Sequence, residues 1–537
     1  MEIARRLLPY ARFATGFVRY LREPLTPGQA RRAVAERLAR REQALAEMVE
    51  RQVYRDEGSP YRALLDAAGW TRSAVLARLA QAGVEGALRE LAESGVYVTL
   101  DEFKGRRPAV RGTHTFAFAE GDFDNTGLDY HVEVRSGGTR SRGTRVPITL
   151  DFSAALATDT AVMFDEWELW DHAQAIWLPM GGAAAVAVLI YAKLGRTPVR
   201  WLSHLPGREL IPAERWTPYL ITGLGRLGSA RIPTPEFAPA TSAGEVARWM
   251  AARTTAGRPV CLTTYASSAV RVAASALDAG LDLARSAFIT IGEPVTDGKR
   301  RIIQRSGARL VVRYAMTEAG IIGYGCLRPR ASDDLHVLES NLALVQQPVG
   351  IGDEGTTVDA LLFTSLLPSA PLVLLNVQSG DYADLNRDAC GCGLERAGYR
   401  LHAAGTRSFE KLSSEGVTFA ASNLLHVLED VLPSRFGGHP TDYQVMEEEG
   451  EDGVPRLVLS VGPSVGAIDE AAVKETFLQH LASTAAGRRT SVLWRRAGTL
   501  LVRRVAPSST KKGKVQPFHL VSAARPAGPE DAAAPPA

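Results

Sequence analysis

Two short segments carry the residue types that bind nucleotides. Residues 135–145 form a loop rich in glycine, hydroxyl side chains and arginine, directly behind a strand-like run. Glycines let backbone N–H groups approach an anion, hydroxyls donate hydrogen bonds, and arginines supply positive charge. Residues 314–320 place an aromatic ring (Tyr314), a hydroxyl (Thr317) and a carboxylate (Glu318) at the end of another strand-like run. A purine ring, a phosphate and a magnesium ion need these groups, so the two segments together indicate ATP.

Each segment has a plainer interpretation when it is taken alone. A loop of glycine, serine, threonine and arginine is also typical of a solvated turn. The loop lacks the Gly-x-x-x-x-Gly-Lys-Ser/Thr pattern of a Walker A motif, and no kinase signature set occurs in the chain. The choice between a turn and an ATP site therefore depends on the motifs around the two segments.

Further motifs follow in a fixed order along the chain. They are residues 263–268, residues 292–294 after an apolar strand-like run, residues 379–381, Arg407 with Gly416, and residues 507–514. Together with the two segments above, they resemble the adenylate-forming superfamily, and specifically its phenylacetate–CoA ligase-like branch. The resemblance covers residues 60–520, which is nearly the whole chain.

The resemblance implies a role for each candidate site residue. Tyr314 would stack on adenine, Thr317 would bind phosphate oxygens, and Glu318 would hold Mg²⁺ between the phosphates. Asp381 would accept hydrogen bonds from both ribose hydroxyls. Lys514, on a C-terminal loop, would reach the reacting carboxylate and the α-phosphate. The remaining nucleotide contacts would come from the phosphate loop, the adenine-binding turn and the domain junction: Ser136, Gly137, Gly138, Thr139, Arg140, Gly292, Glu293, Pro294 and Arg407.

Two places depart from the pattern of the resembled family. Arg140 and Ser141 stand where its phosphate loop carries a small hydroxyl and a glycine, so the loop can follow a different path here. Phe409 occupies the hinge position, which is usually Asp or Lys, and this bears on how the small domain rotates. Outside the ordered set of motifs, an isolated aspartate or arginine would be interpreted as part of a surface ion pair.

The cysteines form a second constellation. Cys390 and Cys392 lie two residues apart, with Cys326 and His336 upstream. Three thiolates and an imidazole make a four-ligand tetrahedral set, and some members of the resembled branch carry a structural zinc at these places. The alternative is free buried thiols, which we expect for the fourth cysteine, Cys261. Four cysteines in 537 residues do not make a disulfide scaffold and fit a reducing, cytoplasmic compartment.

The resemblance implies an AMP-forming acid–CoA ligase. Acid and ATP would give acyl-AMP, and the thiol of CoA would then displace AMP. Trp177, Met180, Tyr265 and Ile321 would line an apolar pocket for an aryl or fatty acid, unless they are ordinary core residues. One alternative is an acyl-protein or acyl-carrier synthetase, which passes the acyl group to a protein-bound thiol. The other is a degenerate adenylate-binding module, against which the retained carboxylate and C-terminal lysine argue.

The elements that must position these residues follow from the hydrophobic pattern. Residues 1–105 are expected to be mainly helical, and short apolar strands alternate with helices between 130 and 380. Such alternation predicts an α/β sheet with crossover helices. We expect a large N-terminal adenylate-forming domain with mixed sheets and helices over 1–405 and a small α+β domain, mobile by resemblance, over 406–524. A disordered Pro/Ala-rich tail is expected over 525–537.

Bulk composition limits the partners. The net charge is +3 and the arginines are spread along the chain without interleaved aromatics, so no nucleic-acid partner is expected. The most apolar stretch, 175–194, is broken by proline and glycine and predicts a buried helix. Residues 1–23 are amphipathic, which allows peripheral membrane contact or, alternatively, a helix packed on the main domain. We also keep a homodimer among the expected assemblies.

Overall fold

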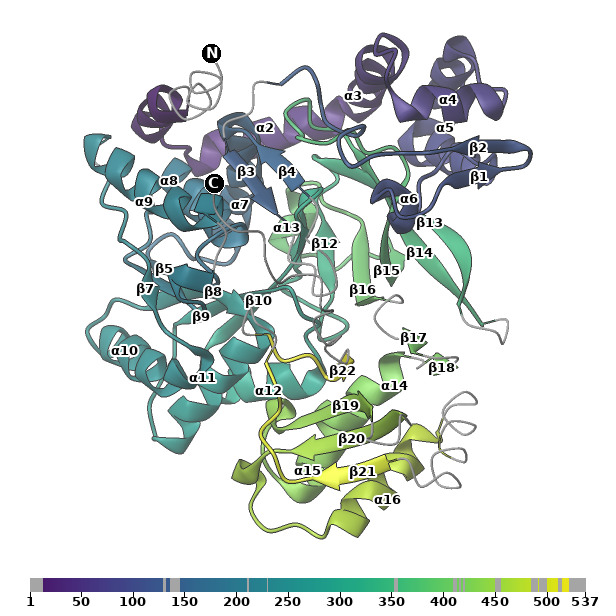
Figure 1. The fold of residues 1–537 in the computed structure, drawn as a ribbon. Helices are drawn as coiled ribbons and strands as arrows, with labels where there is room; N and C mark the ends of the chain where they lie inside the picture. The colour runs from purple at the N-terminus through teal and green to yellow at the C-terminus, as the bar shows by residue number, and fades with distance from the viewer. Residues whose placement is uncertain are drawn as a thin grey trace, which may run out of the picture. The chain divides into compact units, whose positions relative to one another are not determined.

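The computed structural model divides into two compact units. One comprises Met1–Gly416 with Thr510–Lys514, and the other comprises Val417–Ser509 with Val515–Ala537. Figure 1 shows the elements with the labels used below. The structure describes residues 13–128, 132–135, 145–209, 212–228, 230–351, 356–408, 413–414, 417–418, 421–449, 455–483, 491, 500–509 and 514–520.

The large unit begins with a series of helices, and local capping sets the start of some of them. The Thr26 side chain accepts a hydrogen bond from Gln29 N, and the Gln29 side chain accepts one from Thr26 N. This reciprocal cap, with proline at the first helical position, fixes the start of α2 (Pro27–Ala39). The following segments are α3 (Arg41–Met48), a π-helical turn (Val49–Tyr54), α4 (Pro60–Ala67), α5 (Arg72–Glu93) and α6 (Leu100–Phe103).

A twelve-stranded mixed sheet is the framework of the large unit. Its strand order is β13-β14-β15-β16-β12-β11-β10-β9-β8-β5-β6-β7. The direction of strand pairing changes at β10 (Arg309–Met316), which pairs parallel with β9 and antiparallel with β11. All pairs from β9 to β7 are parallel and all pairs from β11 to β13 are antiparallel. The other strands are β5 (Ala173–Trp177), β6 (Arg200–Ser203), β7 (Glu236–Phe237), β8 (Val260–Tyr265), β9 (Ala287–Ile291), β11 (Gly320–Gly325), β12 (Leu335–Val337), β13 (Leu342–Ile351), β14 (Thr356–Ser365), β15 (Val377–Asn386) and β16 (His402–Ser408).

Side chains of the parallel strands alternate between two hydrophobic cores. Ala175 and Trp177 of β5 belong to a core with α10, α11 and α12, whereas Ile176 belongs to the core that contains α7 and α8. Successive side chains of a strand point to opposite faces, and a parallel sheet is covered by helices on both. The helices are α7 (Leu150–Glu166), α8 (Ala183–Lys193), α10 (Ala243–Thr255), α11 (Ala266–Asp278) and α12 (Asp297–Arg305).

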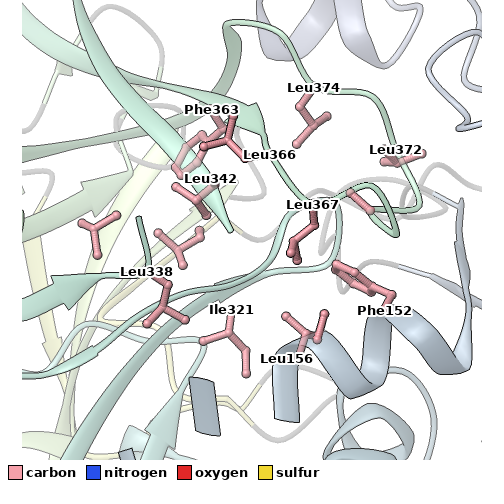
Figure 2. Packing of buried hydrophobic residues seen from close by; sticks show 14 of the residues in the cluster. Phe152, Leu156, Ile321, Leu338, Leu342, Phe363, Leu366, Leu367, Leu372 and Leu374 are labelled. Carbon is pink, nitrogen blue, oxygen red and sulfur yellow. The ribbon is translucent and has the colours of Figure 1, made fainter. Parts of the chain in front are cut away.

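Helix α7 packs against the antiparallel half of the sheet. Its N-cap is Thr149, whose hydroxyl accepts a hydrogen bond from Phe152 N at 3.0 Å. Figure 2 shows Phe152 and Leu156 of α7 among buried side chains from the β11–β15 region. These apolar contacts hold the turn after β10 in place. The labelled neighbours are Ile321, Leu338, Leu342, Phe363, Leu366, Leu367, Leu372 and Leu374.

The second unit contains a four-stranded sheet with helices. Its strand order is β21-β20-β19-β22. With the large mixed sheet and its helices, this arrangement confirms the expected fold class of a large α/β part and a small α+β part. The predicted boundary after residue 405 lies inside β16, and the predicted tail, 525–537, lies outside the described residues. The elements are α14 (Ala421–His426), α15 (Leu432–Phe436), β19 (Tyr443–Glu449), β20 (Pro455–Val461), α16 (Glu470–Leu481), β21 (Leu500–Arg503) and β22 (Phe518–Leu520).

The described part of the amphipathic N-terminus packs on the large unit. Residues 13–22 are helical, and Phe13 and Phe17 are completely buried, with ring centroids 5.1 Å apart. The Tyr20 hydroxyl donates to Leu189 O at 3.0 Å. These rings are therefore core residues and do not face a lipid surface. Within the described ranges, no helix combines the length and the apolar character that a membrane crossing requires.

Candidate active site

The candidate nucleotide-binding residues gather where the parallel strands of the large sheet end. Tyr314 lies near the end of β10, the turn at Gly292 follows β9, and Tyr265 ends β8. These three strands are neighbours and run parallel, so their carboxyl ends meet at one edge. Ligands of open α/β sheets bind outside this edge. The edge lies beside β10, where the pairing changes from parallel to antiparallel.

Tyr314 and Asp381 are joined although 67 positions separate them in the sequence. The Tyr314 hydroxyl donates to Asp381 Oδ2 at 2.6 Å, from β10 to β15. Burial and then the Asp381 carboxylate raise the pKa of Tyr314 well above its ordinary value. The phenol therefore remains a neutral donor to the Asp381 carboxylate.

Glu318 lies in the turn between β10 and β11 and is only 7% exposed. Gly320 closes this turn with φ at +80°, and a Cβ there would lie 2.8 Å from Phe152 Cζ. Only glycine fits both the left-handed backbone and the close approach of α7. A cavity of about 10 Å³ beside Glu318, lined also by Phe152 and Asn341, has room for roughly one water and not for an acyl chain. Thr317, the neighbouring residue, is half-buried.

The turn after β9 is pinned by its own carboxylate. Glu293 accepts hydrogen bonds from Ser267 N at 2.6 Å and from Ser267 Oγ at 2.9 Å. Ser267 lies in the first turn of α11, where unpaired N–H groups and the helix dipole favour a negative charge. The Pro294 carbonyl accepts a hydrogen bond from Lys299 Nζ at 3.0 Å. The predicted adenine-binding turn is thus held by these hydrogen bonds, and its carboxylate is engaged within the protein.

Lys514 reaches this same turn. Its Nζ donates to Gly292 O at 3.1 Å and lies 4.9 Å from the centroid of the Tyr265 ring. Gly292 has φ at +73°, and a Cβ there would lie 2.8 Å from Lys514 Nζ. The glycine therefore leaves room for the ammonium group, which the carbonyl dipole and the aromatic face both attract. The competing lysines 511 and 512 lie outside the described residues.

Arg407 lies on β16 beside Asp381, but its side chain is turned to another carboxylate. Its Nη1 donates to Asp333 Oδ2 at 2.6 Å and to Thr406 O at 2.7 Å. The backbone of Ser408 pairs with that of Asp381. Arg407 is therefore near the predicted ribose site, and its side chain forms a mostly buried ion pair with Asp333, which is not the surface pair of the alternative interpretation.

The predicted phosphate loop is carried by a hairpin. Strands β3 (Val132–Arg135) and β4 (Arg145–Ile148) pair antiparallel, and the Arg135–Arg145 pair closes the base of the loop. Val146 and Ile148 of β4 are buried and anchor the hairpin to the core. The five candidate phosphate contacts lie outside the described residues: Ser136, Gly137, Gly138, Thr139 and Arg140.

The expected acyl-pocket residues lie in the two cores. Trp177 is completely buried and its indole N–H donates to Ala238 O at 2.8 Å. Its ring centroid lies 4.6 Å from that of His204, which lies 5.6 Å from that of Tyr265. The three rings form a column at the carboxyl edge, which Lys514 caps. Met180, Tyr265 and Ile321 are buried with the other core residues, which fits either interpretation of them.

His204 is a member of this column that sequence reasoning missed. It directly follows β6, and that position at the end of a parallel strand was the available signal. Its Nε2 lies 3.4 Å from Ser268 Oγ of α11. Burial, with a smaller effect from Arg271, lowers the pKa of His204 to about 4. The imidazole is therefore neutral near pH 7.

We expect the lowered pKa of His204 to make the folded protein less stable in acid. An unfolded histidine has a pKa of about 6.5, so between pH 6.5 and 4 the unfolded chain binds a proton that the folded chain excludes. The contribution of His204 to the free energy of unfolding is then fully present above pH 6.5. It falls as the pH drops, by about 2 kcal/mol at pH 5. His204→Phe should flatten the decline of the melting temperature from pH 7 to 5. His114→Ala, at an exposed position, is the control, and an equally steep decline in both variants would contradict the assignment.

Four predicted metal ligands come together from separate parts of the chain. The ligand atoms of Cys326, His336, Cys390 and Cys392 all lie within 4.8 Å of one another. His336 Nε2 is 3.1 Å from Cys392 Sγ and 3.5 Å from Cys390 Sγ. Ligand atoms around tetrahedral zinc are roughly 3.5–3.8 Å apart, so the set needs little rearrangement. These residues could therefore hold a metal ion.

The surroundings of this cluster suit a metal. The His336 Nδ1–H donates to Tyr399 O at 2.7 Å, which leaves Nε2 as the free lone pair. Hydrogen bonding from Cys326, assisted by His336, lowers the pKa of the Cys392 thiol, and the thiolate is the ligating form. Cys261 is different, because its burial raises the pKa to about 12 and makes it a core thiol, as expected.

Comparison with known proteins bears on the fold. No protein-family model matches the chain, and no curated protein matches it. A solved 2-hydroxyisobutyryl-CoA ligase in the postadenylation state, in complex with 2-HIB-AMP, is 15% identical, with 93% of this chain and 90% of that chain covered and a TM-score of 0.52. The same ligase with R3-HIB-AMP is 16% identical, with 93% and 90% covered and a TM-score of 0.49. The anthranilate CoA ligase AuaEII with anthranoyl-AMP is 12% identical, with 80% and 73% covered and a TM-score of 0.42. On the first of these comparisons, the chain shares the fold of 2-hydroxyisobutyryl-CoA ligase.

Proposed function

We propose that this protein is an ATP-dependent, AMP-forming acid–CoA ligase of the phenylacetate–CoA ligase-like branch of the adenylate-forming superfamily. The observation that carries the proposal is the grouping of Lys514, Gly292, Tyr314 and Asp381 around one sheet edge, with Glu318 in the adjoining turn. The order of the motifs along the chain supports it. So does the shared fold, because the 2-hydroxyisobutyryl-CoA ligase was solved with 2-HIB-AMP.

The reaction would proceed in two substitutions. A carboxylate oxygen of the acid attacks the α-phosphorus of ATP, a P–O bond forms, and the P–O bond to pyrophosphate breaks. The thiolate of CoA then attacks the acyl carbonyl, a C–S bond forms, and the C–O bond to AMP breaks. Both steps bring anions together, so fixed positive charge and aligned donors must offset the developing charge.

The residues of the site divide this work. The Lys514 ammonium would stabilise the carboxylate and α-phosphate oxygens as they approach. Asp381, oriented by the Tyr314 hydroxyl, would hold the ribose. Glu318, with Thr317 beside it, would hold Mg²⁺, which when bound supplies charge neutralisation to the phosphates. Trp177, Met180, Tyr265 and Ile321 would line an apolar pocket for an aryl or fatty acid, as the resemblance implies.

The acceptor is the part on which the alternatives differ. An acyl-protein or acyl-carrier synthetase would use the same adenylation step and pass the acyl group to a protein-bound thiol. A degenerate adenylate-binding module would bind nucleotide without turnover. The position of Lys514 at the sheet edge supports an active enzyme, since an ammonium group there would offset the charge that develops during adenylation.

A pyrophosphate-release screen tests the proposal. Full-length protein is incubated with ATP, Mg²⁺ and a panel of aryl and fatty acids, with and without CoA. Pyrophosphate release that depends on an acid, together with an acyl-CoA product, is the expected result. Acid-dependent release with no acyl-CoA product would favour a protein acceptor. Nucleotide binding without release for any acid would favour the degenerate module.

We also propose that Cys326, His336, Cys390 and Cys392 hold a structural zinc. The site lies between β11, β12 and α13 (Gly393–Arg396), and it would fasten segments that are far apart in sequence. Structural zinc is four-coordinate, and three thiolates and one imidazole of the protein can fill all four positions. No step of the ligase reaction passes through it.

The zinc site has a direct test. Purified protein should contain about one zinc per chain, and Cys392→Ser should lower both the zinc content and the melting temperature, the latter by roughly 5–10 °C. Cys261→Ser is the matched control, because it changes a buried cysteine outside the cluster and should retain the zinc. A native protein without metal, or a Cys392→Ser variant that is as stable as the parent, would refute the site.

A further inference from the structure

Helix α9 (Pro212–Leu227) exposes an unusual face. Trp216 is 63% exposed, Tyr219 44% and Leu227 71%. They belong to a small group of large apolar side chains that are exposed within the described ranges, and α9 carries three of them. In Figure 1 the helix lies at the outer edge of the large unit. A contiguous set of this kind marks an interaction site more often than scattered single residues do.

The exposed residues share one side of the helix. With 3.6 residues per turn, the exposed positions fall within an arc of about 120°. Arg215 and Arg226 lie at one margin of the arc, and the Arg215 guanidinium is 5.5 Å from the Trp216 ring centroid. No acidic side chain belongs to this face among those that the structure describes. The face, called the α9 face below, consists of Arg215, Trp216, Tyr219, Gly223, Arg226 and Leu227.

The opposite side of α9 is already anchored. Pro218, Ile221 and Gly225 are buried, and a Cβ on Gly225 would lie 2.9 Å from Ile232 Cδ1. The Thr222 hydroxyl donates to Pro233 O at 3.3 Å. The helix is therefore held by its buried side, and the α9 face is not needed for packing within the large unit.

Further positive charge adjoins this face. Leu21 packs at the C-terminal end of α9, because a Cβ on Gly228 would lie 2.6 Å from Leu21 Cδ1. Arg22, the residue after Leu21 in the helical segment 13–22, is exposed. The basic residues at the C-terminal end of α9 thus come from two segments, with Arg226 on α9 and Arg22 beside Leu21, whereas Glu23 pairs with Arg19 at 3.5 Å.

We propose that the α9 face docks on an anionic lipid surface. Tryptophan and tyrosine favour the boundary between headgroups and acyl chains, and arginines extend their guanidinium groups to lipid phosphates. The helix is about 24 Å long and its exposed strip about 10 Å wide, or roughly 240 Å². This is far below the ~800 Å² per partner of a stable protein interface. A second copy fits poorly, because a two-fold contact would oppose arginines with no acidic partner on the face.

Flotation with lipid vesicles tests the proposal on the full-length protein, without nucleotide or acid, so its outcome is independent of the proposed function. Binding to vesicles of phosphatidylcholine with 30% phosphatidylglycerol is expected, with much weaker binding to pure phosphatidylcholine. The combined substitution Trp216→Ala, Tyr219→Ala, Leu227→Ala should lower the partition coefficient tenfold or more. Arg215→Gln and Arg226→Gln should each lower it about fivefold and reduce its dependence on salt.

Val110→Ala and Val199→Ala are the matched controls, because both side chains are exposed on other parts of the unit. They should bind like the parent, and all variants should keep its melting temperature. Equal binding of the parent to neutral and anionic vesicles would overturn the proposal. The proposal would also be overturned if a protein without residues 1–12 lost vesicle binding while the α9 variant kept it. A change from dimer to monomer in the α9 variant, with vesicle binding unchanged, would assign the face to a second copy instead.

Discussion

Lys514→Ala should slow the formation of acyl-AMP from acid and ATP by roughly 10²–10³-fold, because removal of one electrostatic contact to a transition state costs about that much. The Lys514 ammonium lies at Gly292 O and over the Tyr265 ring, so it is placed at the edge where the phosphates would bind. Transfer from supplied acyl-AMP to the thiol should be nearly unchanged. Single-turnover measurements of pyrophosphate release and of AMP release separate the two steps.

Neighbouring lysines provide the controls for this result. Lys511→Ala and Lys512→Ala should leave both steps unchanged. If Lys512 rather than Lys514 is essential, the register of the C-terminal loop is wrong. If both steps fall together in Lys514→Ala, the lysine serves the thiol transfer as well, and its assignment to adenylation alone does not hold. Lys514→Arg keeps the positive charge but replaces the ammonium with a larger guanidinium group, so we expect partial activity from this variant.

Glu318→Gln should abolish magnesium-dependent acyl-AMP formation to a similar or greater extent. The substitution keeps the size of the side chain and removes the charge that a hard divalent cation requires. Because Glu318 is buried in a turn closed by Gly320, the amide should remain in the same place. The fold should be unaffected, which a melting curve and the zinc content together report.

A magnesium titration makes the Glu318 result specific. The parent should saturate with Mg²⁺ at lower concentration than the variant, whereas binding of AMP without metal should be equal in both. Thr317→Ala should give a smaller loss, since a hydroxyl donates one hydrogen bond and holds no charge. Near-normal pyrophosphate release by Glu318→Gln would argue against the assignment of the whole 314–320 motif.

Much of the candidate site could be predicted from local sequence. Residues 314–320, the turn at Gly292–Pro294 and the Cys-x-Cys pair are contiguous motifs, and the sequence placed each of the first two directly after a strand. The alternation of strands and helices predicted the α/β class because periodicity depends only on neighbouring residues. Caps such as Thr26 and Thr149 are equally local, since each accepts from the backbone of a residue three positions later.

Tertiary structure alone decided which of these motifs meet. Tyr314 contacts Asp381, Lys514 contacts Gly292 across 222 positions, and His336 lies among three cysteines from other segments. These contacts depend on strand order, and the order around β10 is not encoded in the period of any one strand. Burial likewise turned Phe13 and Phe17 inward and lowered the pKa of His204, because desolvation depends on every element packed around a side chain. The sequence determined which chemical groups this protein has, and packing decided which of them act together.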